Sequence, residues 1–180
     1  MTKRAASLLV LAIAGAWLAA ALPQNTQKDW KEYAYNGDGF AVSAPSEPVM
    51  TKQEKETPTG NVEVHNYAIE LGNNSGVMLS SAEIKGAEGV DPKLLLQNAK
   101  TGAVTAMNAK ITTEKEITLE TNPGVQFEAE NENFHVRARM YMIKGKLLTL
   151  LAVAPATTAI PANADRIFAS LKLLKPAAPK

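Results

Sequence analysis

The chain offers few side chains that could do chemistry, and its two histidines are the first to consider. His65 and His135 are the only imidazole groups. Together with a carboxylate such as Glu63 or Glu128, they could bind a metal ion if two strands brought them together. Neither histidine stands in a metal-type spacing such as HxH or HExxH. The favoured interpretation is therefore two isolated strand histidines, with no metal and no cofactor.

A basic strip on one predicted strand is our first choice for a binding patch. Alternate residues of a β-strand share a face. The predicted strand 134–143 therefore has one face made of His135, Arg137, Arg139 and Tyr141. Because a guanidinium group suits bidentate recognition of carboxylates and other anions, this strip could form an anion site.

A structural role for the two arginines is the interpretation that we favour. The preceding predicted strand carries three acceptors on one face, namely Gln126, Glu128 and Glu130. A hairpin through residues 131–133 would place Arg137 and Arg139 opposite these acceptors. Cross-strand ion pairs of this kind contribute roughly 0.2–1 kcal/mol each.

The serines lack the partners that nucleophilic catalysis requires. A serine nucleophile needs a base and a group that orients the base. No G-x-S-x-G turn surrounds Ser43, Ser80 or Ser81, and ordinary strand serines are the better interpretation. We expect no catalytic residue, and hence a protein that is not an enzyme.

The remaining candidates are also better explained by structure than by chemistry. Glu114, Glu116 and Glu120 alternate with other residue types, which is typical of a solvated sheet face rather than of a glycosidase pair. Met140 and Met142 alternate with polar residues, and we expect them to pack in the core rather than to hold a cofactor.

The composition excludes several further classes of function. The 180 residues include no cysteine, so the chain can form neither disulfides nor thiolate zinc or iron–sulfur sites. Lys and Arg number 19 against 18 Asp and Glu, so there is no basic surplus and we expect no nucleic-acid partner. The length is sufficient for one domain with a hydrophobic core.

The first residues have the pattern of an export signal. Lys3 and Arg4 precede an uncharged run, Ala5–Ala21. Ala19 and Ala21 form a small-x-small pattern, so we expect residues 1–21 to be a signal peptide that is cleaved after Ala21. The alternative is an uncleaved membrane anchor, although about 17 residues is short for a bilayer core of roughly 30 Å. Cleavage predicts a periplasmic or secreted protein, and the anchor predicts a protein tethered outside the cytoplasm.

The rest of the chain is predicted to be one domain. Residues 22–29 form a linker, residues 30–174 the globular domain, and residues 175–180 a disordered tail. Short strand-like runs are separated by turn residues such as Asn36-Gly37-Asp38-Gly39. The nine predicted strands are 30–35, 40–43, 49–56, 62–71, 77–84, 110–119, 124–130, 134–143 and 147–153.

Two helices are predicted to cover these strands. Asp91 is a natural N-cap and Pro92 suits the first helical position, so a helix is expected over 92–108. One face of this helix carries the apolar residues Leu94, Leu95, Ala99, Val104 and Met107. A second helix is expected over 161–170, followed by a short strand at 171–174. The fold class is therefore α+β, with an antiparallel sheet of about seven to nine strands and helices packed on it.

Two spaced patterns resemble a group of exported bacterial domains. The first extends from Trp30 and Tyr35 through Gly39-Phe40-Ala41-Val42-Ser43-Ala44-Pro45 to Pro48. The second is an arginine-containing strand, a leucine-rich strand and a helix ending in Phe168-Ala169-Ser170-Leu171-Lys172-Leu173. The fold of this group is similar to the α/β/α sandwich of the PsbP-like superfamily, whose best known members are extrinsic subunits of photosystem II. The resemblance implies a fold and not a function, since PsbP-type proteins act by binding a larger complex and neither an enzymatic activity nor a binding site transfers from them.

These observations favour an exported, non-enzymatic domain that binds a protein or an envelope component. The alternative is a carrier of a small molecule or lipid, with a pocket between the sheet and the helix 92–108. A hydrolase with dispersed catalytic residues is the least favoured, since histidine is so scarce. A membrane partner is expected only if the N-terminal segment stays uncleaved.

Overall fold

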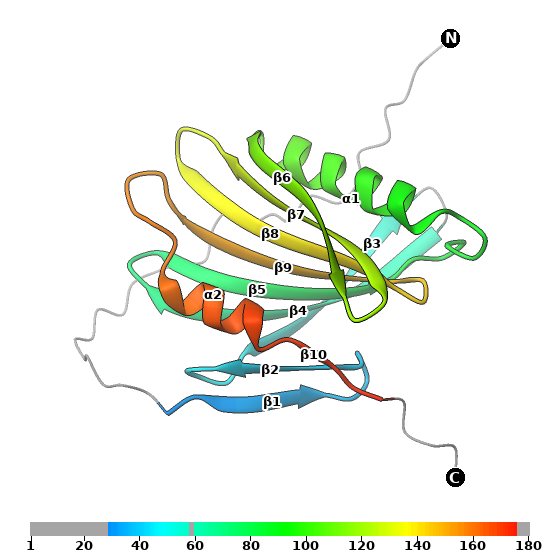
Figure 1. The fold of residues 1–180 in the computed structure, drawn as a ribbon, viewed down its shortest axis with the longest axis horizontal. Coiled ribbons are helices and arrows are strands. Elements are labelled where there is room, and N and C mark those ends of the chain that lie inside the picture. The colour runs from blue at the N-terminus through cyan, green and yellow to red at the C-terminus, as the bar shows by residue number, and fades with distance from the viewer. Residues whose placement is uncertain (1–28, 58–59, 176–180) are drawn as a thin grey trace.

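A computed structural model describes residues 29–57 and 60–175. Within these ranges the chain forms two antiparallel sheets and two helices (Figure 1). The predicted signal peptide 1–21, the linker residues 22–28 and the tail residues 176–180 lie outside the described residues. Among the helices that are described, none has the length and apolar character needed to cross a bilayer.

The larger sheet has seven strands in the order β3-β4-β5-β9-β8-β7-β6. Its strands are β3 (Val49–Thr57), β4 (Gly60–Gly72), β5 (Ser75–Glu83), β6 (Lys110–Leu119), β7 (Asn122–Glu130), β8 (Phe134–Ile143) and β9 (Lys146–Pro155). The smaller sheet has the order β1-β2-β10, with β1 (Lys31–Tyr35), β2 (Phe40–Ala44) and β10 (Lys172–Leu173). The helices are α1 (Pro92–Ala106) and α2 (Ala162–Ala169).

The two helices lie on opposite faces of the larger sheet, as the α/β/α prediction requires (Figure 1). Helix α1 packs on β7 and β8, where Leu96 shares a core with Phe127. Helix α2 and the smaller sheet cover the other face, where Phe168 and Phe40 share a second core with Leu79. Side chains alternate between the two faces along each strand, so the central sheet supplies both cores.

The strands are divided between two sheets, whereas the sequence predicted a single sheet of seven to nine strands. Strand β2 pairs with β1 and with the C-terminal strand β10, which confirms the predicted strand at 171–174. Four of the five β2 residues are buried, because the smaller sheet packs face to face on the larger one instead of extending it. Pro45 and Pro48 separate β2 from β3, and proline interrupts a ladder of hydrogen bonds.

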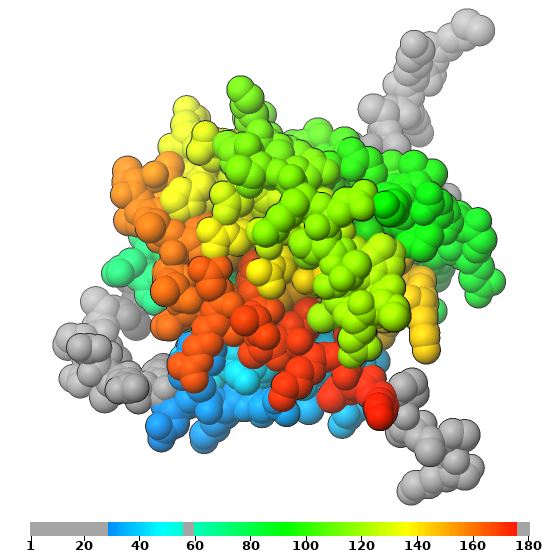
Figure 2. Space-filling model, in the orientation of Figure 1, coloured from blue at the N-terminus to red at the C-terminus, as the bar shows by residue number. Residues whose placement is uncertain are grey.

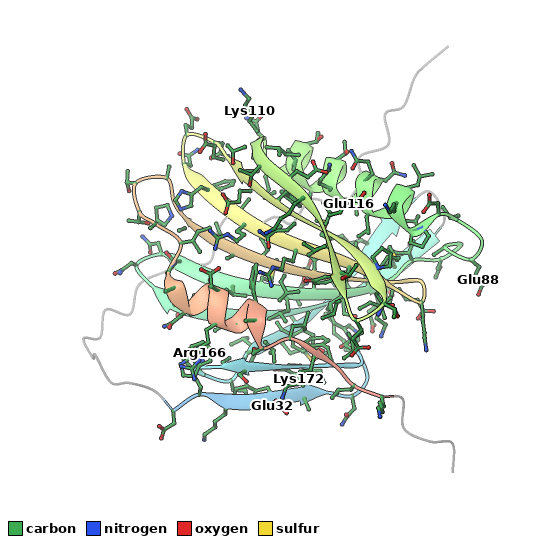
Figure 3. All side chains as sticks on the ribbon, viewed as in Figure 1. Glu32, Glu88, Lys110, Glu116, Arg166 and Lys172 are labelled. Carbon is green, nitrogen blue, oxygen red and sulfur yellow. The ribbon has the colours of Figure 1, made fainter. Side chains whose placement is uncertain are left out.

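The two ends of the domain therefore lie together. Figure 2 shows the N-terminal hairpin, in blue, against the C-terminal segment, in red. Lys172 of β10 forms an ion pair with Glu32 of β1 across the central strand β2 (Figure 3).

Helix α1 begins where the sequence predicts and ends two residues earlier. The Asp91 carboxylate accepts a hydrogen bond from the Lys93 backbone N–H at 2.9 Å, which confirms the predicted N-cap. The prediction that Leu94 lies on the buried face is wrong, because this side chain is 53% exposed. The buried residues of the helix are Leu96 and Lys100, which are one turn apart and lie about 160° and about 120° around the axis from Leu94.

One close approach in the larger sheet requires a glycine. Gly124 of β7 lies opposite Tyr141 of β8. A Cβ atom at position 124 would stand 2.5 Å from Cδ1 of Tyr141 and 2.6 Å from the Met140 carbonyl oxygen. The aromatic ring of Tyr141 and a backbone oxygen atom therefore both occupy the space that a side chain at position 124 would need.

We predict that Gly124→Ala destabilises the domain by roughly 1–3 kcal/mol, because the strand or the Tyr141 ring must shift. Urea unfolding followed by tryptophan fluorescence measures this change. Gly37→Ala is the matched control, because no atom lies within 4 Å of the added Cβ there. Equal stability of the two variants would contradict the packing described here.

Candidate functional site

The strongest candidate site is a cavity of about 220 Å³ between α1 and the larger sheet. Seven strands spaced about 4.8 Å apart make a face roughly 30 Å wide, whereas a helix is only about 10 Å across. Helix α1 rests on β7 and β8, so it leaves the neighbouring part of this face, over β9, β5 and β4, without a close-packed cover. We call this hollow the α1 cavity. The pocket that the sequence predicts for the carrier alternative would lie in this location.

The wall of the α1 cavity is mainly apolar and includes four methionines. These are Met78, Met107, Met140 and Met142. The helix contributes Leu95, Ala99 and Ala103 to the opposite wall, where two small side chains leave room. Met140 and Met142 are both 4% exposed, so the predicted core packing is confirmed, and both also face the cavity. Methionine side chains are flexible and polarisable, which suits a cavity that adapts to its occupant.

A row of polar side chains crosses the apolar floor of the cavity. Asn66, Ser80 and Thr149 lie directly opposite one another on β4, β5 and β9. The Ser80 hydroxyl donates a hydrogen bond of 2.8 Å to Oδ1 of Asn66. Both residues are buried. Ser80 therefore has an amide as its partner and not the base that a nucleophile would need.

The exposed part of the lining marks where the cavity meets solvent. Gln53 of β3 and Asn98 of α1 are exposed members of the wall. Lys55 of β3 also lines the cavity, and burial lowers the pKa of its ammonium group. The rim between β3 and α1 is therefore polar, while the interior is apolar.

A second cluster of polar groups lies on the opposite face of the larger sheet, around Asp38 in the turn between β1 and β2. Nδ1 of His65 lies 2.8 Å from the Asp38 carboxylate, and the Tyr67 hydroxyl donates to the same carboxylate. Nε2 of His65 contacts Glu63, and Lys146 lies 3.9 Å from Asp38. These contacts join the smaller sheet to β4 and β9.

The protonation of this cluster follows from its contacts. Burial raises the pKa of the Asp38 carboxyl, but the hydrogen bonds from Tyr67 and His65 outweigh it, so the net pKa lies below 3.8. The hydrogen bonds to Asp38 and Glu63 hold the pKa of His65 above 6.5. Burial, together with the Asp38 carboxylate, raises the pKa of the Tyr67 phenol. The contacts therefore favour the imidazolium form of His65 and the carboxylate form of Asp38.

The hollow beside this cluster, of about 470 Å³, is a weaker candidate than the α1 cavity. It is lined by charged groups of both signs, and Asp38, Glu63 and His65 already bind one another. In the described part of the chain, no group of three or more metal-type side chains could hold a cation.

The interpretation of His65 as an isolated strand histidine is wrong. Its two ring nitrogens are bound to Asp38 and Glu63, and the only sequence signal for this was the i, i+2 spacing of Glu63 and His65 on one strand face. Ser81 lies opposite His65 on β5, but neither ring nitrogen is directed to it as a base. Ser43 donates its backbone N–H to the Ser170 hydroxyl, a contact within the smaller layer.

The predicted strip on β8 packs beneath α2. The expected cross-strand pairing is confirmed, since Nε of Arg137 donates to Glu128 at 2.7 Å, and Arg137 also binds Asp165 of α2. Arg139 donates to Gln126 and lies over the Phe168 ring.

The other two members of the strip, His135 and Tyr141, are also turned inward. Nε2 of His135 is buried without a partner among the described residues, and Tyr141 is 4% exposed, with a pKa raised by burial. His135 and His65 do not share a site. The strip makes mainly internal contacts, and its role as a binding patch stays a prediction.

The three glutamates of the predicted solvated face differ from one another. Glu114 of β6 binds Lys100, whose side chain is buried within α1. Glu116, labelled on β6 in Figure 3, is exposed and binds Lys93 at the start of α1. The solvated-face interpretation holds for all three glutamates, since each is exposed, and Glu114 in addition supplies the partner of a buried ammonium group.

The arrangement as a whole is an α/β/α sandwich with an apolar cavity under one helix. No family model matches the chain, and no curated protein does. The solved structure of cyanobacterial PsbP (CyanoP) from Synechocystis sp. PCC 6803 is similar to it, with a TM-score of 0.56 and 12% identity over 86% of this chain and 98% of that chain. The domain therefore has a PsbP-like fold, as the sequence resemblance implied.

A second solved structure is more distant. PA94, a protein of unknown function from Pseudomonas aeruginosa, has a TM-score of 0.36 and 8% identity over 76% of this chain and 86% of that chain. This similarity is too weak for a conclusion about fold or function.

The Asp38–His65 pair predicts a defined pH dependence of stability. The pKa of His65 is raised, so its contribution is complete below pH 6.5 and is lost as the pH rises through the folded-state pKa. The pKa of Asp38 is lowered, so its contribution is present above pH 3.8 and is lost as the pH falls through the folded-state pKa.

We expect the free energy of unfolding of the wild type to fall as the pH rises above 6.5, and His65→Phe to lack this fall. Urea titrations over a series of pH values measure it. His135→Phe, at the other histidine, is the control and should keep the wild-type profile. A profile unchanged by His65→Phe would show that the pair does not couple protonation to folding.

Proposed function

We propose that this protein is a non-enzymatic binding domain that carries a small, mainly apolar molecule in the α1 cavity. The observation that supports the proposal is an apolar hollow of about 220 Å³ beneath a helix of the domain. Interiors of proteins are close-packed, and a hollow of this size destabilises a fold unless something fills it. This is the carrier hypothesis of the sequence analysis, placed ahead of the partner-binding hypothesis.

The dimensions suit a ring compound or a short acyl chain. A cavity of about 150 Å³ lined by aliphatic and aromatic side chains binds benzene in an engineered protein, and the α1 cavity is larger. Each methylene group moved from water into such a site contributes about 0.8 kcal/mol. The polar rim at Gln53 and Asn98 would let a ligand enter between β3 and α1.

We further propose that the protein is exported. The support is the N-terminal sequence, with Lys3 and Arg4 before an uncharged run that ends in a small-x-small pattern. A mature chain that begins at Leu22 in intact-mass measurement would support a periplasmic or secreted carrier. A full-length mass would favour the anchored alternative.

Partner binding is the second candidate function. It is favoured by Val49 and Met50, which are 65% and 45% exposed on the edge strand β3. Edge strands with exposed apolar side chains can accept a strand from another protein. Capture of an envelope protein that is lost when Val49→Lys and Met50→Lys are combined would support this candidate, and capture unaffected by them would exclude it.

Filling the cavity tests the carrier proposal. N-phenyl-1-naphthylamine, a neutral fluorescent probe of apolar sites, should bind the wild type with increased emission. Ala99→Phe places a ring in the cavity, and we expect a loss of probe affinity of roughly tenfold or more. Thr101→Phe adds the same ring on the exposed side of α1 and is the matched control.

Two results would count against a carrier. One is a wild type that shows no saturable binding of the probe. The other is an Ala99→Phe variant that is folded by thermal unfolding and binds the probe as tightly as Thr101→Phe.

A further inference from the structure

The polar row on the floor of the α1 cavity contains more hydrogen-bonding capacity than the protein itself uses. Asn66 is 7% exposed and Ser80 is 8% exposed, in a wall that is otherwise mainly apolar. The rungs of the sheet on either side of this row are apolar, with Ala82 beside Leu147 and Met78 beside Leu151. Apolar residues in this row would pack equally well against their neighbours, so packing alone does not explain the polar side chains.

The internal hydrogen bond leaves one group of Asn66 unused. The Ser80 hydroxyl donates to Oδ1 of Asn66. The amide nitrogen Nδ2 carries two N–H donors, and no described residue accepts a hydrogen bond from it. Nδ2 is not among the fully buried unpaired atoms of the described residues, so it is open to the cavity, and a ligand group that accepts from it there would stabilise the complex.

The surroundings also select the charge of that acceptor. Asn66 and Ser80 are uncharged, and Lys55, the cationic residue of the wall, lies on the edge strand β3 opposite Val62 and not opposite Asn66. A carboxylate or phosphate placed against Asn66 and Ser80 would lose its hydration against two uncharged side chains. A carbonyl oxygen is a strong acceptor that loses far less on leaving water.

We infer that the ligand of the α1 cavity is a neutral carbonyl compound, such as a ketone, ester or amide with an apolar ring or chain, and that Nδ2 of Asn66 donates to its carbonyl oxygen. This inference rests on the proposed carrier function and specifies its ligand class. Asn66 is then the residue that selects the ligand, while the methionines and α1 enclose the apolar part.

Two probes of nearly the same shape test the inference. Acetophenone has a carbonyl oxygen where α-methylstyrene has a methylene group. The dissociation constant of each is measured by displacement of N-phenyl-1-naphthylamine from the full domain. The ratio of the two constants is compared between variants, so that their different hydration cancels.

We expect Asn66→Leu to shift this ratio toward α-methylstyrene by roughly three- to tenfold, the range of one hydrogen bond. Asn163→Leu removes an exposed asparagine on α2, away from the α1 cavity, and should leave the ratio unchanged. A ratio that is the same in Asn66→Leu and in the wild type would overturn the inference. Binding of neither probe, and no displacement, would instead refute the carrier function itself.

A measurement on the wild type keeps the inference testable even if Asn66→Leu does not fold. The infrared carbonyl band of acetophenone should move to lower frequency on binding than in a hydrocarbon solvent, because a hydrogen bond weakens the C=O bond. A bound carbonyl with the frequency of the hydrocarbon solution would show that no donor reaches it, and the inference would fall.

Discussion

The structure depends on one constraint: a single helix is too narrow to cover one face of the larger sheet. A face of roughly 30 Å has to be removed from water, and a single helix covers about a third of it. Helix α1 packs on β7 and β8, so the mismatch appears over β4, β5 and β9 as the α1 cavity. The small side chains Ala99 and Ala103 widen the gap on the helix side. The architecture therefore produces the cavity, and the small side chains of α1 leave it unfilled.

The opposite face of the larger sheet is equally wide, but it is covered more completely. There α2 and the smaller sheet act together as a cover, and Phe40, Tyr67 and Phe168 fill the space between the layers. The Asp38 carboxylate fixes one end of this cover by accepting hydrogen bonds from the larger sheet. This face is covered by a second sheet as well as by a helix, and Asp38, His65 and Glu63 bind one another there, so the apolar site lies on the side of α1.

The sequence predicted the elements better than their assembly. Turn residues located the strands, Asp91 and Pro92 located the start of α1, and the pocket between sheet and helix was already an alternative. The division into two sheets was not predictable, because β10 pairs with β2 from the far end of the chain. The Asp38–His65 contact joins residues 27 positions apart, which no local pattern reveals. The polar row of Asn66, Ser80 and Thr149 depends on the register of three strands, so it cannot be predicted from the spacing of residues along any one strand.

The measurement that tests the central claim most directly is the mass of the protein isolated from its own cells, under native and then denaturing conditions. The account predicts that the native mass exceeds the denatured mass by that of one neutral organic molecule. It also predicts that Ala99→Phe, isolated in the same way, lacks this difference while Thr101→Phe retains it. Identical native and denatured masses of the wild type, with no exchange of added apolar ligand into the protein, would contradict a carrier.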